Sequence, residues 1–397
     1  MEGGRNMKKT KLFFLFCLLP FSLLSCNGKS EAENDAENKI LLKKVEGVTT
    51  LFHLLSADQL RSITRYEDAV IFVSLPNCSH CKKERTFLDE YIKNTQCILY
   101  DVSYDTYQEA YDDQTNSIGE YAFQFPKVTG TPTYLFYKNG KLTDSHIAGF
   151  GNDSYSDFVD AFEKYVRPIN LYMTNDYFSG KENDGLIEYQ YFDNSENLEQ
   201  TKNLDILGFS TETMKKKIQE EKNITILFTW RRCQDCSSLR NDFLNVYLLE
   251  HQDKKIYYYE IDGYAQLKRM SDETYRTLGL NMWSDFSNEF RLIDDSFFHI
   301  DDLGNHAGYT PTIVHYENGK YVSKEVYLNE EEVVINEDHT LSYVKAFHSE
   351  AKTLKSDTKV NNDDPTDSSY QKALKELNNK VKEYDLDTIS AYIKEVL

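Results

Sequence analysis

The sequence predicts an α/β protein in which the same order of strands and helices occurs twice along 397 residues. In each copy, a strand-like apolar run leads into a Cys-x-x-Cys motif, and the residues after the motif have the apolar spacing of an amphipathic helix. In each copy, a Thr-Pro-Thr segment later starts another strand-like run, which ends at an Asn-Gly pair. A repeat of several features in the same order indicates that one architecture has been duplicated.

The first copy carries its strand signal at residues 69–74, whose apolar and β-branched side chains are typical of a buried strand. Cys78 and Cys81 follow, and apolar residues then recur with helical spacing over 87–92. The Asn-Gly pair at 139–140 separates two strand-like runs and therefore predicts a tight hairpin.

The second copy has its corresponding strand-like run at residues 224–230, followed by Cys233 and Cys236. A second Asn-Gly pair, at 318–319, again predicts a hairpin. The interval between the Cys pair and the Thr-Pro-Thr segment is longer than in the first copy. We therefore expect an insertion at about 266–305.

The amino terminus has the layout of an export signal. Three lysines between positions 8 and 11 precede an apolar run at 12–24, which is too short to span a bilayer comfortably. The run ends in Leu-Leu-Ser-Cys and resembles a bacterial lipoprotein signal. This resemblance implies that Cys26 is lipidated and becomes the mature amino terminus, anchored at the extracytoplasmic face of a bacterial membrane. The alternative is an ordinary cleaved signal with a chance cysteine.

The domain organisation follows from polar stretches that lack a sustained period. We expect six segments: a signal peptide at 1–25, a flexible tether at 26–39, a first domain at 40–168, a linker at 169–205, a second domain with the insertion at 206–355, and a polar linker with a C-terminal helix at 356–397.

The Cys-x-x-Cys spacing carries the chemistry. Two cysteines three positions apart at a helix start lie close enough to form a tight disulfide. The unpaired N–H groups and the dipole of the helix favour a thiolate on the first sulfur. Such a thiolate is present at neutral pH and is a good leaving group. Disulfides persist outside the cytosol, which fits an exported protein.

At these motifs the chain resembles the thioredoxin family, over about 51–166 and 210–354. The resemblance implies two thioredoxin-like domains, each a central mixed β-sheet flanked by helices. It also implies that the Thr131-Pro132 and Thr310-Pro311 peptide bonds are cis and face the Cys pairs, because a proline occupies this place in the family.

The resemblance further implies roles for the side chains. Cys78 and Cys233 would exchange with a substrate disulfide, and Cys81 and Cys236 would resolve the mixed disulfide. Backbone groups of Thr131 and Thr310 would pair with the bound peptide, beside Pro132 and Pro311. The redox-active disulfides are the only redox groups expected, without a separate cofactor or metal.

Neighbouring charges predict how reactive each pair is. His80 lies inside the first motif, where disulfide-forming members of the family often carry histidine, and a donor imidazole lowers the pKa of the thiolate. Asp235 opposes thiolate formation in the second motif, whereas Arg231 and Arg232 favour it. The chain departs from thioredoxin itself six positions before each pair. Phe72 and Leu227 stand there in place of a buried acid, so resolution is expected to be slower.

Together these features predict an extracytoplasmic, membrane-anchored thiol–disulfide oxidoreductase that acts on cysteines of exported proteins. Each turnover changes the redox state of a Cys pair, so a membrane redox partner must restore that state. The net charge of −20 repels phosphate backbones and disfavours nucleic-acid binding.

Four other interpretations compete with this one. Each pair could be a structural disulfide, the folds could be non-catalytic binding or secretion-accessory modules, the four cysteines could ligate one zinc ion, or electrons could pass between the two domains. Cys97 lies in a strand-like run, so we expect a buried rather than a reactive thiol there.

Overall fold

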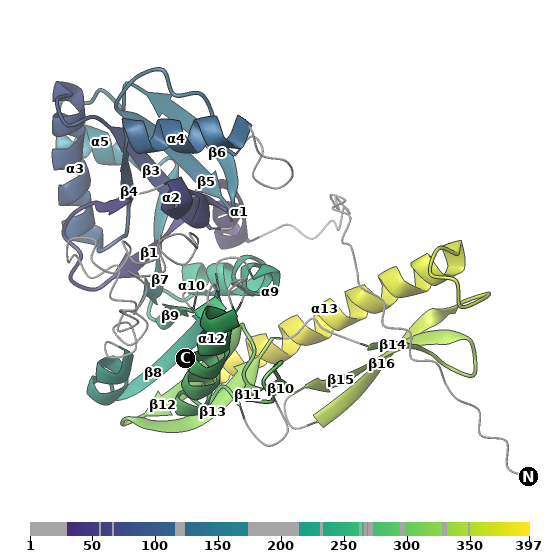
Figure 1. Ribbon diagram of the computed structural model, residues 1–397. Coiled ribbons are helices and arrows are strands. Elements are labelled where there is room, and N and C mark those ends of the chain that lie inside the picture. The colour runs from purple at the N-terminus through teal and green to yellow at the C-terminus, as the bar shows by residue number, and fades with distance from the viewer. Residues whose placement is uncertain are drawn as a thin grey trace, which may run out of the picture.

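The computed structural model describes residues 30–54, 57–65, 67–115, 124–173, 214–230, 233–261, 264–265, 268, 273–293, 298–327, 332–347 and 350–397. Within these residues the chain is an α/β protein with two large mixed sheets flanked by helices (Figure 1). A small three-stranded sheet and a long C-terminal helix extend away from them. The predicted fold class is confirmed.

The first large sheet has five strands in the order β2-β4-β3-β5-β6. Strands β2, β4 and β3 are parallel, whereas β5 and β6 are antiparallel to their neighbours. The strands are β2 (Phe52–Leu54), β3 (Ala69–Ser74), β4 (Tyr100–Ser103), β5 (Thr133–Lys138) and β6 (Lys141–Ile147). The helices of this unit are α2 (Ala57–Thr64), α3 (Ser79–Thr95), α4 (Tyr104–Thr115) and α5 (Tyr155–Phe162).

The second large sheet has six strands in the order β1-β7-β9-β8-β12-β13. Its two outermost parallel strands come from either side of the segment that forms the five-stranded sheet, so this sheet is assembled from distant parts of the chain. The strands are β1 (Ile40–Val45), β7 (Val166–Met173), β8 (Asn223–Thr229), β9 (Ile256–Glu260), β12 (Thr312–Glu317) and β13 (Lys320–Val326).

The two sheets share one arrangement of four strands. The order β4-β3-β5-β6 in the first corresponds to β9-β8-β12-β13 in the second, with the same parallel and antiparallel pairs. Both predicted hairpins are confirmed. Asn139 and Asn318 have φ of 49° and 50°, and the glycine after each has φ of 77°. Positive φ at both positions is what a two-residue hairpin turn of type I′ requires.

The helices that follow the two Cys pairs differ. Helix α3 runs unbroken over seventeen residues. Its counterpart is α9 (Gln234–Leu239), which passes through a π-helical turn, η4 (Arg240–Leu244), into α10 (Asn245–Glu250). The predicted insertion contains helix α12 (Glu273–Glu289) and a short hairpin of β10 (His299–Ile300) and β11 (His306–Ala307).

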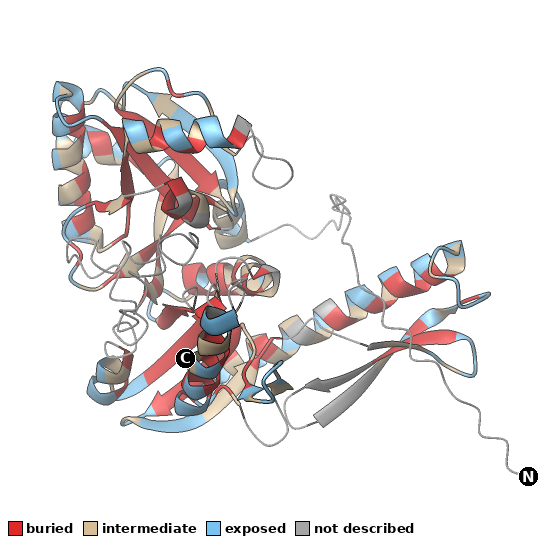
Figure 2. Cartoon of the chain, in the orientation of Figure 1, coloured by how far each residue is buried: buried red, intermediate tan, exposed pale blue. Residues whose placement is uncertain are grey.

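The hydrophobic core is continuous between the two large sheets. The central strands are buried along most of their length, whereas the edge strands β6 and β13 are largely exposed (Figure 2). Ile71 and Leu88 of the five-stranded unit belong to the same buried cluster as Leu227, Leu248 and Ile313 of the six-stranded unit. The two units therefore share apolar contacts that neither could bury alone.

Three segments read as tether or linker have regular structure instead. Residues 31–38 form helix α1 (Glu31–Asn38), because Ser30 caps its first turn and Ala32 and Ala36 pack on the core. Residues 169–173 continue β7, because they pair with both β1 and β9. Residues 356–359 complete strand β16, which pairs with β15. The remainder of the predicted linker, 174–205, lies outside the described residues.

The C-terminal region forms an arm. Strands β14 (Glu332–Ile335), β15 (Thr340–Phe347) and β16 (Glu350–Lys359) make an antiparallel sheet, and helix α13 (Ser368–Val396) lies along it (Figure 1). Leu341 and Leu377 are fully buried between them in a separate cluster. Further along α13, Ile389 and Ile393 enter the main core. No described helix is long and apolar enough to cross a membrane.

The anchoring of α13 can be tested by truncating one side chain. Ile393→Ala should lower the free energy of unfolding by about 2–5 kcal/mol, because it leaves a cavity in the main core. Ile335→Ala is the control, since that side chain is 39% exposed, and it should cost about 1 kcal/mol or less. Chemical denaturation measures both. Equal costs would mean that α13 does not dock on the core.

Candidate redox sites

The first Cys pair lies at the amino terminus of α3. Cys78 is the N-cap residue, and its Sγ accepts a hydrogen bond from the N–H of Cys81 at 3.0 Å. The two residues form a disulfide with their Cα atoms 5.2 Å apart. Cys78 is half-buried and Cys81 is buried. The outer sulfur, held at the positive end of the helix, is thus the one that solvent or a substrate can reach.

The loop before β5 faces this pair. The Thr131-Pro132 peptide bond is cis. The Sγ of Cys78 lies 3.5 Å from the carbonyl oxygen of Thr131, so a reduced thiol there could donate a hydrogen bond to it. The loop itself is fixed by the hydroxyl of Thr133, which donates to the carbonyl of Gly130 at 2.7 Å.

A buried carboxylate, Glu84, lies one helical turn after Cys81, and sequence reasoning missed it. Its side chain accepts hydrogen bonds from the hydroxyl of Tyr134 at 2.7 Å and from the N–H groups of Phe150 and Gly151 at 3.2 and 3.1 Å. Burial, together with this carboxylate, raises the pKa of Tyr134, which therefore keeps its proton. The available signal was a charged residue three positions after Cys81, on the inward face of the helix.

Gly149 allows this carboxylate to approach the proline loop. Its φ is +73°, and a Cβ at this position would lie 2.8 Å from Oε1 of Glu84 and 3.1 Å from Cγ of Pro132. Glu84 and Pro132 therefore converge on a point where only glycine fits.

A second set of polar side chains connects α3 to the five-stranded sheet. Arg85 pairs with the buried Asp101 of β4 and donates to the hydroxyl of Ser74 at 3.2 Å. Asp101 also bonds Nδ1 of His53 at 3.0 Å. Asp101 is directly beside Phe72 in the sheet register. The acid that the sequence lacks at position 72 is thus present on the neighbouring strand, where a guanidinium neutralises it.

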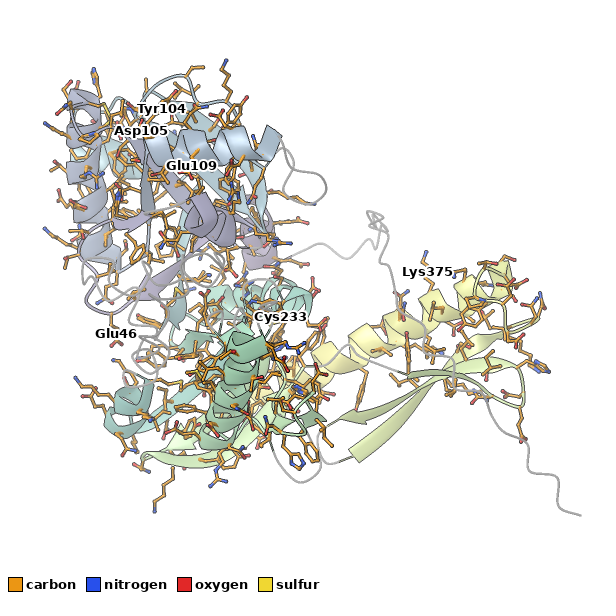
Figure 3. The ribbon with its side chains drawn as sticks, in the orientation of Figure 1. Glu46, Tyr104, Asp105, Glu109, Cys233 and Lys375 are labelled. Atoms are coloured by element: carbon orange, nitrogen blue, oxygen red, sulfur yellow. A yellow bond between two sulfur atoms is a disulfide. The ribbon has the colours of Figure 1, made fainter. Side chains whose placement is uncertain are left out.

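The second Cys pair repeats the geometry of the first. Cys233 caps α9, and its Sγ accepts from the N–H of Cys236 at 3.0 Å. The two form a disulfide with the Cα atoms 5.2 Å apart. The Thr310-Pro311 bond is cis, and the carbonyl of Thr310 lies 3.7 Å from Sγ of Cys233. Figure 3 marks the position of Cys233 at the centre of the molecule.

Access to the second pair is lower. Cys233 is only 8% exposed and Cys236 is completely buried. The groups beneath the helix also differ, because Leu239 occupies the position that corresponds to Glu84. Register places Tyr258 beside Leu227, as Asp101 is placed beside Phe72. The second site therefore has no counterpart of the buried carboxylate at Glu84.

The other predicted site residues lie as follows. His80 is exposed in the first turn of α3, and Asp235 is half-buried in the first turn of α9. Cys97 is fully buried, and burial raises the pKa of its thiol to about 12, so the prediction of a buried thiol is confirmed. Cys26, Arg231 and Arg232 lie outside the described residues.

Comparison with known proteins finds likeness among solved structures only. No family model matches the chain, and no curated protein is significantly similar to it. A thioredoxin from Plasmodium falciparum is 22% identical with a TM-score of 0.22, over 29% of this chain and 98% of its own. Mitochondrial thioredoxin 3 from Saccharomyces cerevisiae is 17% identical with a TM-score of 0.21, over 28% and 93%.

A thioredoxin from Aeropyrum pernix is 20% identical with a TM-score of 0.21, over 29% of this chain and 93% of its own. Values this low carry no argument about activity. The strands, helices and Cys-x-x-Cys pairs define an α/β protein with two mixed sheets, in each of which a buried strand leads to a disulfide at the amino terminus of a helix.

The contact at Gly149 predicts a specific cost for adding a methyl group. Gly149→Ala should destabilise the protein by more than about 2 kcal/mol, because it adds overlap with Glu84 and Pro132 to the cost of a left-handed conformation. Gly151→Ala is the matched control, since φ there is +67° with nothing within 4 Å, and it should cost about 1–2 kcal/mol. Denaturant midpoints measure the loss of stability in each variant. Equal losses would contradict the close approach of Glu84 and Pro132 to Gly149.

The His53–Asp101 pair predicts a dependence of stability on pH. The hydrogen bond that His53 donates to Asp101 raises the pKa of His53, so protonated His53 favours the folded state. This stabilisation should be complete below the ordinary histidine pKa of about 6.5 and should decline as pH rises through the raised value. Unfolding of the wild type and of His53→Gln at pH 5.5 and 8.5 measures it. A difference between the two proteins that is no larger at pH 5.5 would contradict the pairing.

Proposed function

We propose that the protein is a thiol–disulfide oxidoreductase whose principal catalytic pair is Cys78 and Cys81. The observation that carries the proposal is the half-buried Sγ of Cys78, which caps a seventeen-residue helix, accepts the N–H of Cys81 and lies 3.5 Å from the carbonyl of Thr131. A helix terminus that stabilises a thiolate beside an open backbone carbonyl suits exchange with an extended peptide.

In the reducing direction, the Cys78 thiolate attacks one sulfur of a substrate disulfide. The substrate S–S bond breaks, a Cys78–substrate disulfide forms, and the other substrate sulfur leaves as a thiolate that takes a proton from water. The Cys81 thiolate then attacks Sγ of Cys78 and releases the second substrate thiolate. Two electrons pass from the dithiol to the substrate, and the reverse sequence oxidises a substrate dithiol.

Glu84 is well placed to act on the second step. Cys81 is buried and must lose its proton before it can attack, and the Glu84 carboxylate lies one turn further along the same helix, where it accepts hydrogen bonds from the N–H groups of the loop after β6. Its buried position makes it a candidate for accepting that proton, which the position six residues before Cys78, occupied by Phe72, cannot do.

We also propose the cellular setting. The basic and apolar amino-terminal segment that ends at Cys26 supports export and lipid anchoring at the extracytoplasmic face of a bacterial membrane, with exported protein or peptide thiols as substrates. A membrane redox partner would recharge the pairs, and the two repeated units would be thioredoxin-like domains that need no cofactor besides their cysteines. The net charge of −20 disfavours nucleic acid as a partner.

A second function, a structural disulfide, is favoured for the second pair by one observation. Cys233 is 8% exposed, so a protein substrate reaches its sulfur less readily than that of Cys78. A disulfide so enclosed exchanges slowly even when its geometry is suitable. We therefore assign the faster exchange to Cys78.

Substitution of single cysteines tests this assignment. Cys78→Ser should reduce the rate of insulin reduction, or of dithiol-peptide oxidation, to the uncatalysed rate, because the attacking sulfur is lost. Cys233→Ser should keep more than half of the activity. Cys97→Ala is the control, since that cysteine is buried and forms no disulfide. Unchanged activity in the Cys78→Ser/Cys233→Ser double variant would refute the oxidoreductase.

A further inference from the structure

A buried charged group lies beneath the second redox helix, and we call it the junction cluster. It consists of Lys43, Glu67, Arg240, Tyr258 and Glu260, all of which are at most 7% exposed. None of these residues belongs to the two Cys-x-x-Cys motifs or to the loops that face them. Burying charged groups of this kind costs free energy unless each charge is paired.

Arg240 connects the cluster to the redox helix. It lies four residues after Cys236, and its Nε donates to the Cys236 carbonyl at 3.3 Å. It is also the first residue of the π-helical turn, and Nη2 donates to the hydroxyl of Ser237 at 3.2 Å. The guanidinium is therefore fixed against the first turn of the helix that Cys233 caps.

The partners of Arg240 come from elsewhere in the chain. Its Nη1 contacts both carboxylate oxygens of Glu67, and Glu67 also binds the Lys43 ammonium. Glu67 lies just before β3 and Lys43 lies in β1, so both precede the first Cys pair in sequence. Tyr258 completes the connection, because its hydroxyl contacts Glu67 at 3.3 Å and donates to Glu260 at 2.8 Å.

The Glu67 carboxyl of the cluster is ionised at neutral pH. Burial opposes ionisation of Glu67, but the adjacent Arg240 and Lys43 outweigh it and hold the pKa of that carboxyl well below its usual range. Burial lowers the pKa of Lys43, and the Glu67 carboxylate works against that change. A negative charge on Glu67 thus lies between two cations, one of which touches the backbone of the redox helix.

Among the residues that the structure describes, the first Cys pair has no equivalent of this arrangement. Arg85 occupies the position corresponding to Arg240, but its side chain is 39% exposed and its acid, Asp101, belongs to the adjacent strand of the same sheet. Solvent screens a charge that is exposed to this degree. Within the described parts of the chain, the charged set beneath the second pair is fully buried and partly supplied by a distant segment, whereas the one beneath the first pair is not.

We propose that Glu67 and Lys43 are positioning residues that set the dithiol–disulfide equilibrium of Cys233 and Cys236 through Arg240. Reduction of this disulfide adds two electrons and leaves a thiolate on Cys233 once Cys236 takes up one proton. The thiolate is stabilised by positive charge beneath the helix and destabilised by negative charge. The net charge of the cluster therefore decides how readily the second pair is reduced. This inference rests on the exchange chemistry proposed above.

Two substitutions of opposite sign test the inference in the full chain. Glu67→Gln removes a negative charge but keeps the shape and acceptor, and should shift the second pair towards the dithiol by roughly three- to tenfold in equilibrium constant. Lys43→Met removes a positive charge at similar volume and should shift it towards the disulfide. Each protein is equilibrated in graded glutathione or dithiothreitol buffers, quenched with acid, alkylated, and quantified by mass spectrometry of both Cys-x-x-Cys peptides.

The design contains its own controls. The dithiol–disulfide equilibrium constant of the first pair should change less than about twofold in either variant, because solvent and distance screen that pair from the cluster. Lys380→Met removes the same charge from the surface of α13 and should change neither pair. Thermal unfolding reports whether each variant folds, and if one does not, the other decides.

The inference would be overturned if the dithiol–disulfide equilibrium of the second pair shifted in the same direction in both variants, or in neither. A purely structural cluster would loosen the site whichever charge is removed, and would not give shifts of opposite sign. The readout uses a small-molecule thiol. A wild-type protein without oxidoreductase activity would therefore refute the proposed function, while the equilibrium measurement would still test this inference.

Discussion

The structure depends on one local interaction, the hydrogen bond from a backbone N–H in the first helical turn to the sulfur that caps the helix. In both copies the first cysteine accepts this bond from the second at 3.0 Å, and a proline loop places a carbonyl beyond it. The buried strands β3 and β8 lead into these caps, and the Asn-Gly hairpins fix the neighbouring strands. The rest of each unit holds that sulfur in position.

The two copies have kept this geometry but differ in what lies beneath the helix. Below α3 there is a carboxylate, Glu84, that binds the loop after β6, whereas Leu239 takes its place below α9. The arginine one position later is common to both helices. Arg85 remains within its own sheet unit, and Arg240 reaches Glu67 in the other. The same scaffold therefore presents an open sulfur in one unit and an enclosed sulfur in the other.

Local patterns in the sequence predicted the local structure well. The strands before each Cys pair, the helices after them and both hairpins follow from apolar period and turn chemistry, which act over a few residues. Pairing of β1 with β7 could not be predicted, because more than a hundred residues separate these parallel strands and neither carries a signal for its partner. The burial of Glu84 and Glu67 could not be predicted for a related reason. A single acidic residue in a sequence is expected to be exposed to solvent until its partners are known.

The placement of β1 and β7 has a consequence for how the chain acquires its structure. The five-stranded unit is inserted between two strands that belong to the other sheet, and β7 must then pair with β9, which is still later in sequence. During synthesis the first unit can close on its own strands and β1 can pair with β7, but β7 keeps an open edge until residues 256–260 have emerged. Late, non-local parallel pairing is slow to form and leaves apolar strands exposed meanwhile. The sheet that leads to the second Cys pair can therefore be completed only after strands from both sides of the five-stranded unit are available.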